Sequence, residues 1–111
     1  NIFFTHEIDD IDALLSREAS LHLYRIIQET LNNMVKHAEA KAASVTIEKK
    51  GHTIEATIAD NGKGFEISEK VKISTSLGMK TLMERAKILH SKIDIKSQIN
   101  KGTTITLIIP I

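Results

Sequence analysis

The pattern of apolar and polar positions predicts strands and helices in alternation along the chain. Residues 2–8 form a short β-branched and aromatic run, which predicts a strand, and the acidic positions after it predict a loop. Apolar residues then recur every three or four positions from Leu23 to Val35, which predicts a helix ending near Ala38. Ser16 precedes this helix and is expected to cap its first turn.

The middle of the chain predicts a β-hairpin followed by a polar segment. Residues 43–50 and 53–60 alternate between apolar and polar positions around the dipeptide Gly51-His52, a pattern typical of two strands joined by a two-residue turn. Residues 61–76 are polar and have little apolar periodicity. We therefore expect them to form a lid beside a neighbouring site.

The last third of the chain predicts a second helix and a second hairpin. Apolar spacing over 78–90 predicts an amphipathic helix, and residues 92–98 and 103–109 predict two closing strands joined by a turn at 100–102. Together these elements predict an α+β fold. It is a two-layer α/β sandwich in which a mixed sheet carries helices on one face.

The composition is that of one small domain. A chain of 111 residues is long enough to bury about 60–70% of its unfolded surface in one core, and no repeat or linker divides residues 1–111. The formal net charge of +1 offers no electrostatic footprint for nucleic acid or for an acidic membrane surface. The chain has no cysteine, which excludes disulfides and thiolate metal sites.

Two further features concern the setting of the domain. No apolar run approaches the roughly 20 residues that a membrane span needs, and the start at Asn1 carries neither a methionine nor a basic signal region. We therefore expect a cytoplasmic domain excised from a longer protein. In isolation it is expected to be monomeric, with no contact to nucleic acid or membrane.

Three separate segments carry residues suited to bind a nucleotide, and the first lies in the long helix. Glu29 and Asn33 are four positions apart, so their side chains share a helical face and lie about 5–6 Å from each other. Two oxygen ligands at that spacing suit one hard cation such as Mg²⁺, directly or through water. The first segment therefore predicts a metal site.

The second segment begins with Asp60 at the end of an alternating strand and continues through Gly62 and Gly64. The carboxylate can accept a hydrogen bond from the exocyclic amine of adenine, a contact that the carbonyl of guanine cannot make. Alternatively, Asp60 caps the turn that follows it. The two glycines allow a sharp turn in which a ligand can approach bare backbone.

The third segment, Ser76-Leu77-Gly78-Met79, opens the second helix. The first turn of a helix has free N–H groups and the positive end of the helix dipole, which together suit phosphate. Lys80, two residues after Gly78, is a weaker phosphate candidate. The third segment therefore predicts the phosphate end of a nucleotide site.

In this order the three segments resemble the ATP-binding domain of the histidine kinases, in the superfamily shared with gyrase, the heat-shock chaperone ATPase and the mismatch-repair ATPase. Residues 29–38 resemble the N box and residues 60–65 the first glycine box. Residues 77–86 resemble the reduced second glycine box of sensor kinases that feed response regulators with helix-turn-helix outputs. Ser76 departs from the fuller pattern, which leaves only Gly78 to admit phosphate. The resemblance covers nearly the whole chain and implies the Bergerat ATP-binding fold.

The resemblance also implies roles for the matching residues. Asn33 is implied as the direct Mg²⁺ ligand, and Glu29 either orders a metal-bound water or acts as a general base. Lys36 is implied to meet the terminal phosphates, while His37 either touches phosphate or packs. Thr103 either holds adenine through a water or is simply a half-buried strand residue. The implied nucleotide-binding set is Asn33, Lys36, His37, Asp60, Gly62, Gly64, Leu77, Gly78, Met79 and Thr103.

The function that follows from the resemblance is phosphoryl transfer in two-component signalling. The domain is expected to bind Mg-ATP and to donate the γ-phosphoryl group to a histidine on the kinase's own dimerisation domain, which is absent from this chain. A response regulator is the downstream partner. His6 is not expected to be the acceptor, because its neighbours predict a strand.

Two alternatives remain open. An anti-sigma-type serine kinase shares the same boxes, and a degenerate, nucleotide-free interaction module shares the fold. Residues 83–86, Met-Glu-Arg-Ala, favour the sensor kinase, and the presence of Glu29, Asn33, Asp60 and Gly64 counts against the degenerate module.

Overall fold

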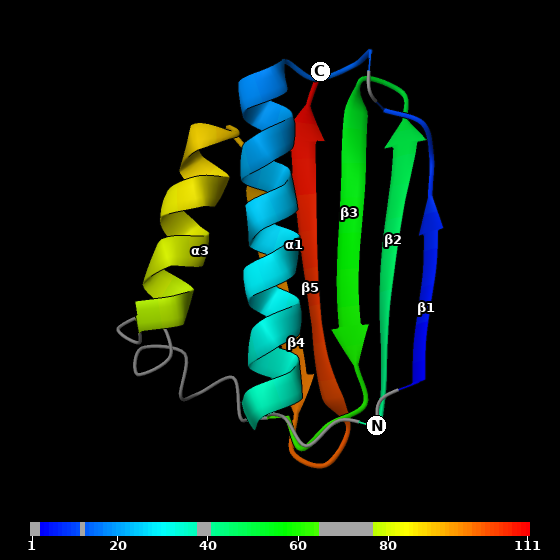
Figure 1. Ribbon diagram of the computed structural model, residues 1–111, viewed down its shortest axis with the longest axis vertical. Helices are drawn as coiled ribbons and strands as arrows, with labels where there is room; N and C mark the ends of the chain where they lie inside the picture. The colour runs from blue at the N-terminus through cyan, green and yellow to red at the C-terminus, as the bar shows by residue number, and fades with distance from the viewer. Residues whose placement is uncertain (1–2, 12, 38–40, 65–76) are drawn as a thin grey trace.

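The computed structural model describes residues 3–11, 13–37, 41–64 and 77–111, with the backbone alone for residues 33–37 and 77–81. Within these residues, two helices lie over one face of a five-stranded sheet (Figure 1). The elements are, in chain order, β1 (Phe3–Ile8), α1 (Arg17–His37), β2 (Ala42–Lys50), β3 (Thr53–Asp60), α3 (Leu77–Ile88), β4 (Lys92–Gln98) and β5 (Gly102–Pro110). The expected α+β sandwich, a mixed sheet with helices on one face, is confirmed.

The sheet has the strand order β1-β2-β3-β5-β4. β1 pairs with β2 in parallel, and the other three pairings are antiparallel. The parallel pair requires a crossover, which α1 supplies. The antiparallel part is built from two hairpins, whose inner strands β3 and β5 lie next to each other.

Alternate residues of the strands build the core. In β2 and β3 every second residue is buried, as expected for strands with one face against helices. These side chains meet α1 and α3, and the core consists of Leu23, Ile26, Ala43, Val45, Ile47, Ile54, Ala56, Ile58, Leu82, Ala86, Leu89, Ile105, Leu107 and Ile109. All six residues of β1 are exposed.

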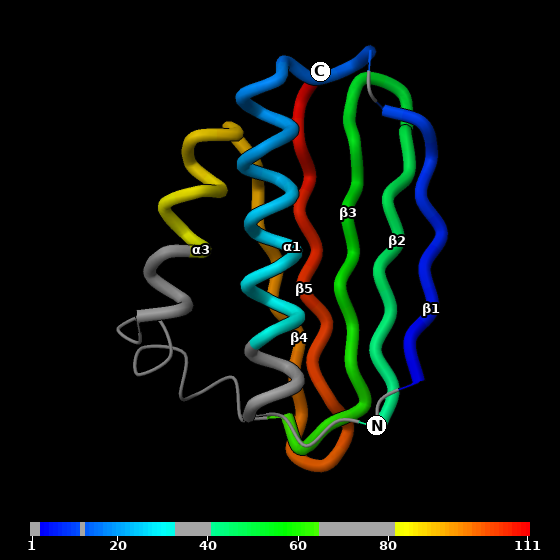
Figure 2. The backbone as a smooth tube through the Cα atoms, in the orientation of Figure 1, coloured from blue at the N-terminus to red at the C-terminus, as the bar shows by residue number. Residues whose placement is uncertain are grey.

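One end of the molecule gathers several chain segments. The C-terminal part of α1 and the end of β3 lie at the same end of the molecule (Figure 1), and the tube view shows the β4–β5 turn beside the end of β3 (Figure 2). Because β3 and β5 are antiparallel, the last residue of β3 faces the beginning of β5. This arrangement brings residues from distant parts of the sequence to one edge of the sheet.

Both helices have identifiable end signals. The Ser16 hydroxyl accepts a hydrogen bond from the Ala19 N–H at 3.0 Å, so the predicted N-cap of α1 is confirmed. α3 ends at Ile88, two residues earlier than expected, because His90 has a positive φ of 54°. The Ser91 N–H then bonds to the Ala86 carbonyl at 2.9 Å, and this six-to-one bond closes a Schellman motif.

We expect Ser16→Ala to lower the free energy of unfolding by about 1 kcal/mol, because the first turn of α1 loses its side-chain acceptor. Urea denaturation should show a lower midpoint with an unchanged slope. Ser20→Ala, one turn further along α1, is the matched control and should cause no comparable loss, since alanine is the better helix former. Equal losses in the two variants would contradict the capping role.

Candidate functional site

A polar row crosses the inner face of the sheet at the end where β3 stops. The row consists of Asp60 of β3, Thr103 of β5 and Ser97 of β4, which the strand pairing aligns across the sheet. In β2 the aligned residue is the apolar Ala43. The neighbouring row on the same face is apolar and consists of Val45, Ile58, Ile105 and Ile95. Val45, Ile58 and Ile105 of this apolar row are buried in the core, so the polar row marks the edge at which the core ends.

Asp60 is half-buried and its carboxylate is partly used by its own turn. Asp60 Oδ1 accepts a hydrogen bond from the Gly62 N–H at 2.7 Å, which is the turn-capping contact considered from the sequence. Within the part of the chain that the structure describes, Oδ2 has no hydrogen bond. The two interpretations of Asp60 are therefore compatible, because one oxygen holds the turn while the other can meet a ligand.

Thr103 lies directly opposite Asp60 on the adjacent strand. Paired residues on neighbouring strands have Cβ atoms about 4.5–5.5 Å apart, so one small group can contact both side chains. Thr103 Oγ1 also lies 2.9 Å from Ser97 Oγ. Ser97 was not among the predicted site residues, although counting back across the 99–101 turn from Thr103 would have paired the two.

Two glycines, the predicted Gly64 and Gly102 of the β4–β5 turn, are required by close backbone approach. Gly64 has a φ of +60°, and a Cβ there would collide with the Gln98 carbonyl oxygen. Gly102 has a φ of +88°, and a Cβ there would collide with the Asp60 carbonyl oxygen. These contacts press the loop after β3 against the β4–β5 turn, so side chains are excluded from both positions.

Hydrogen bonds complete the closure of this end. The Asn61 side-chain oxygen accepts the N–H groups of Lys41 and Ala42 at 2.9 and 2.8 Å. The Asn100 N–H donates to the Lys63 carbonyl at 2.7 Å. Asn61 therefore ties the loop to β2 while Asn100 ties it to the second hairpin, and Asp60 is held between them.

On the helical side, Glu29 is the predicted site residue whose side chain is described. Its Oε1 atom lies 3.4 Å from Nη2 of Arg85 on α3. Both side chains are partly exposed, so the ion pair contributes less than about 1 kcal/mol, and its main effect is to orient Glu29 between the helices. Asn33 follows one turn later on α1. A carboxylate and an amide carbonyl form a hard oxygen donor set, and these residue types fit Mg²⁺.

The remaining predicted residues are described only in part. Asn33, Lys36 and His37 belong to the last turns of α1, and Leu77, Gly78 and Met79 belong to the first turn of α3, each with its backbone alone described. Most of the predicted lid, residues 65–76, lies outside the described residues. The described portion therefore fixes the adenine end of the predicted site more fully than its phosphate end.

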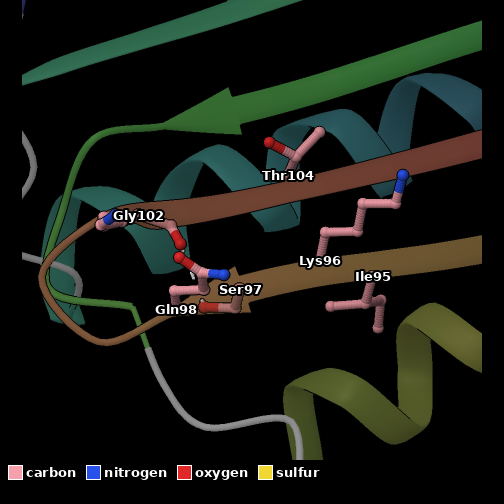
Figure 3. Close-up of a pocket in the computed structure, with 7 residues that line it drawn as sticks. Ile95, Lys96, Ser97, Gln98, Gly102 and Thr104 are labelled. Atoms are coloured by element: carbon pink, nitrogen blue, oxygen red, sulfur yellow. Dashed lines mark hydrogen bonds between the residues drawn. The ribbon is translucent and has the colours of Figure 1, made fainter.

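Two hollows flank the polar row. A cavity of about 420 Å³ lies beside the β4–β5 turn and is lined by Ser97 and Gly102 together with Lys96, Gln98 and Thr104 (Figure 3). The last three belong to the opposite face of the sheet, so this cavity wraps around the β4 edge. A second, mainly apolar hollow of about 390 Å³ lies between α1 and β1, on the far side of α1 from Glu29.

The described residues contain neither a helix that could span a membrane nor a cluster of metal-binding side chains. None of the described helices has the length and apolar character that a membrane span needs. Across ranges 3–11, 13–37, 41–64 and 77–111, no three His, Cys, Asp or Glu side chains gather as a metal-binding group.

The chain belongs to the family described as histidine kinase-, DNA gyrase B- and HSP90-like ATPases, which matches residues 18–111. It is 37% identical over 89 residues to the oxygen sensor histidine kinase NreB of Staphylococcus carnosus, and the match covers 80% of this chain and 25% of that protein. The resemblance to the ATP-binding domain of sensor histidine kinases is thereby confirmed. The chain spans about a quarter of the length of this relative.

Solved structures share the fold. The histidine kinase domain of the Erythrobacter litoralis blue-light activated kinase EL346 superposes with a TM-score of 0.84 at 18% identity, covering 98% of this chain and 51% of that one. Full-length ShkA in complex with AMPPNP superposes with a TM-score of 0.83 at 18% identity, covering 99% of this chain and 26% of that one. At these identities the likeness concerns the fold.

We expect Gly64→Ala to cost more than about 3 kcal/mol of unfolding free energy, because the new Cβ meets a backbone carbonyl that cannot move aside. Gly51→Ala is the matched control. Gly51 also has a positive φ, of 58°, but open space surrounds it, so only the left-handed strain of about 1–2 kcal/mol applies. Urea denaturation measures both, and equal losses would contradict the close approach at Gly64.

Proposed function

We propose that this domain binds Mg-ATP and donates its γ-phosphoryl group to a histidine on a separate dimerisation domain of the same sensor kinase. A response regulator then receives the phosphoryl group, and the domain works in the cytoplasm. The observation that carries the proposal is the pairing of Asp60 with Thr103 on adjacent strands, at the edge of the apolar core. The family and the similarity to NreB, an oxygen sensor histidine kinase, support the reaction class.

Asp60 supplies the base recognition. Its Oδ1 atom is engaged by the Gly62 N–H, which fixes the carboxylate and directs Oδ2 toward the ligand. Adenine presents an amine at position 6, whereas guanine presents a carbonyl there, so an acceptor at this place favours adenine. ShkA, which shares the fold, was solved with the ATP analogue AMPPNP.

The phosphate end uses α1. Glu29 and Asn33 would hold Mg²⁺, which when bound neutralises negative charge on the phosphate oxygens. Lys36 lies three residues after Asn33, so the two residues share a helical face, and Lys36 would approach the terminal phosphate. His37 and the first turn of α3, which includes Leu77, Gly78 and Met79, offer further polar contacts. Arg85 keeps the Glu29 carboxylate directed between the helices.

Transfer requires an acceptor that this chain does not supply. In the described structure His6 lies in the edge strand β1, on the far side of α1 from Glu29, and cannot reach a phosphate bound there. Placing an acceptor nitrogen in line with the γ-phosphate contributes about 7–11 kcal/mol to such a reaction. A dimerisation domain that docks beside this site and presents its histidine would provide that placement.

The trans-phosphorylation experiment tests this function. The purified chain is incubated with labelled Mg-ATP, alone and with the histidine-bearing domain of the parent kinase. We expect acid-labile, base-stable label on the added domain and none on the chain itself. Label on the chain that His6→Gln abolishes would overturn the assignment. Acid-stable label on an added serine substrate would favour the serine kinase instead.

We expect Asp60→Ala to weaken ATP binding by about 1.5–3 kcal/mol, the range for a hydrogen bond to a charged group. Calorimetry with ATP and GTP measures both the loss and the change in preference. Asp94→Ala, an exposed carboxylate of β4, is the control and should leave both affinities unchanged. Equal affinity of the unmodified chain for ATP and GTP would contradict the role of Asp60.

We expect Asn33→Ala to slow phosphoryl transfer more than it weakens nucleotide binding. The metal acts on charge that develops during transfer, while the adenine contacts at Asp60 remain. The trans assay at saturating ATP gives the rate, and calorimetry with ADP gives the affinity. Asn32→Ala, the exposed neighbour on α1, is the control. A variant that loses ADP affinity but keeps its transfer rate would contradict this assignment.

A further inference from the structure

Ser97 of β4 completes the polar row but has no role in the nucleotide site proposed above. Its side chain is buried, with 8% of its surface exposed. Figure 3 shows Ser97 beside Gly102, the residue that begins β5. The Ser97 hydroxyl oxygen lies 3.1 Å from the Gly102 carbonyl oxygen and 2.9 Å from Thr103 Oγ1. Because the Ser97 hydroxyl contacts both oxygens, it limits which of the three groups donates each hydrogen bond.

The donor and acceptor of each bond follow from counting hydrogens. A carbonyl oxygen can only accept, so Ser97 donates its single hydroxyl hydrogen to Gly102. The bond between the two hydroxyl groups must then be donated by Thr103. In this arrangement Thr103 has no hydrogen left, and Oγ1 can only accept from any further partner.

The adenine end of the site thus becomes a pair of acceptors. Asp60 Oδ2 is an acceptor when ionised, and Thr103 stands opposite it in the strand register. The amine at position 6 of adenine has two hydrogens, which it can give to these acceptors directly or through a water. A base with a carbonyl at position 6 would place a third acceptor beside them, and that arrangement is repulsive.

We infer that Ser97 is a specificity-determining positioning residue, which selects a 6-amino purine by holding Thr103 as a hydrogen-bond acceptor. The inference rests on the proposed nucleotide-binding function and adds to it a residue that acts through Thr103. Ser97 itself does not contact the base. Without its hydroxyl group, the Thr103 hydroxyl can rotate and donate to a carbonyl at position 6.

The test compares ADP with inosine diphosphate, each with Mg²⁺, by calorimetry. The two bases differ at position 6, where adenine has an amine and hypoxanthine a carbonyl. We expect the unmodified chain to prefer ADP. In Ser97→Ala the ratio of ADP affinity to inosine diphosphate affinity should fall roughly threefold to tenfold, the range for one neutral hydrogen bond.

Control variants separate specificity from folding. Ser97→Thr keeps the hydroxyl group and should restore the preference, while Ser91→Ala, at the other end of β4, should leave it unchanged. A purely structural role would weaken both nucleotides together and leave their ratio intact. If Ser97→Ala does not fold, Ser97→Cys serves instead, because its thiol is a weak donor of similar shape, and the same fall in the ratio is expected.

Coupling to Thr103 gives a second readout. In a Thr103→Val background, adding Ser97→Ala should not change the ratio further, because the hydroxyl that Ser97 orients is already absent. An unchanged ratio in folded Ser97→Ala, with ADP still preferred by the unmodified chain, overturns the inference alone. Absence of ADP binding by the unmodified chain overturns the proposed function, and with it this inference.

Discussion

The close approach of two backbone segments at one end of the sheet is the constraint on which the site depends. The loop after β3 touches the β4–β5 turn so closely that Gly64 and Gly102 cannot carry a side chain. Hydrogen bonds of Asn61 hold the loop against β2, and a hydrogen bond of Asn100 holds it against the β4–β5 turn. Because Asp60 lies where these segments meet, its carboxylate has a fixed direction before any ligand arrives. Such preorganisation lowers the entropic cost of binding.

The sheet and the helices contribute different chemical groups to the end of the molecule where β3 stops. The sheet provides an edge of hydrogen-bonding groups where the apolar core ends, and α1 carries the Glu29 carboxylate on its side toward α3. The contact between Glu29 and Arg85 joins α1 to α3, so the orientation of the carboxylate depends on how the two helices pack. In the site proposed above, recognition of the base is assigned to the strands and handling of the phosphates to the helices.

Local patterns in the sequence predicted most of the fold. The alternation around Gly51 and the cap at Ser16 depend on neighbouring residues, and both were confirmed. The bonds of Asn61 to β2 and the ion pair of Arg85 join residues 19 or more positions apart, so no local pattern reveals them. Ser97 was not predicted as a site residue, because its place beside Thr103 depends on the strand register across the turn. A buried serine in a strand has no distinctive sequence signal.

The strand β1 contributes no residue to the polar row. It joins the sheet through β2 alone, all six of its residues are exposed, and the polar residues of the row lie on β3, β5 and β4. The family match starts at residue 18, after β1 has ended. β1 therefore widens the sheet and supplies none of the hydrogen-bonding groups of the row, so the edge that carries those groups is built by the antiparallel strands.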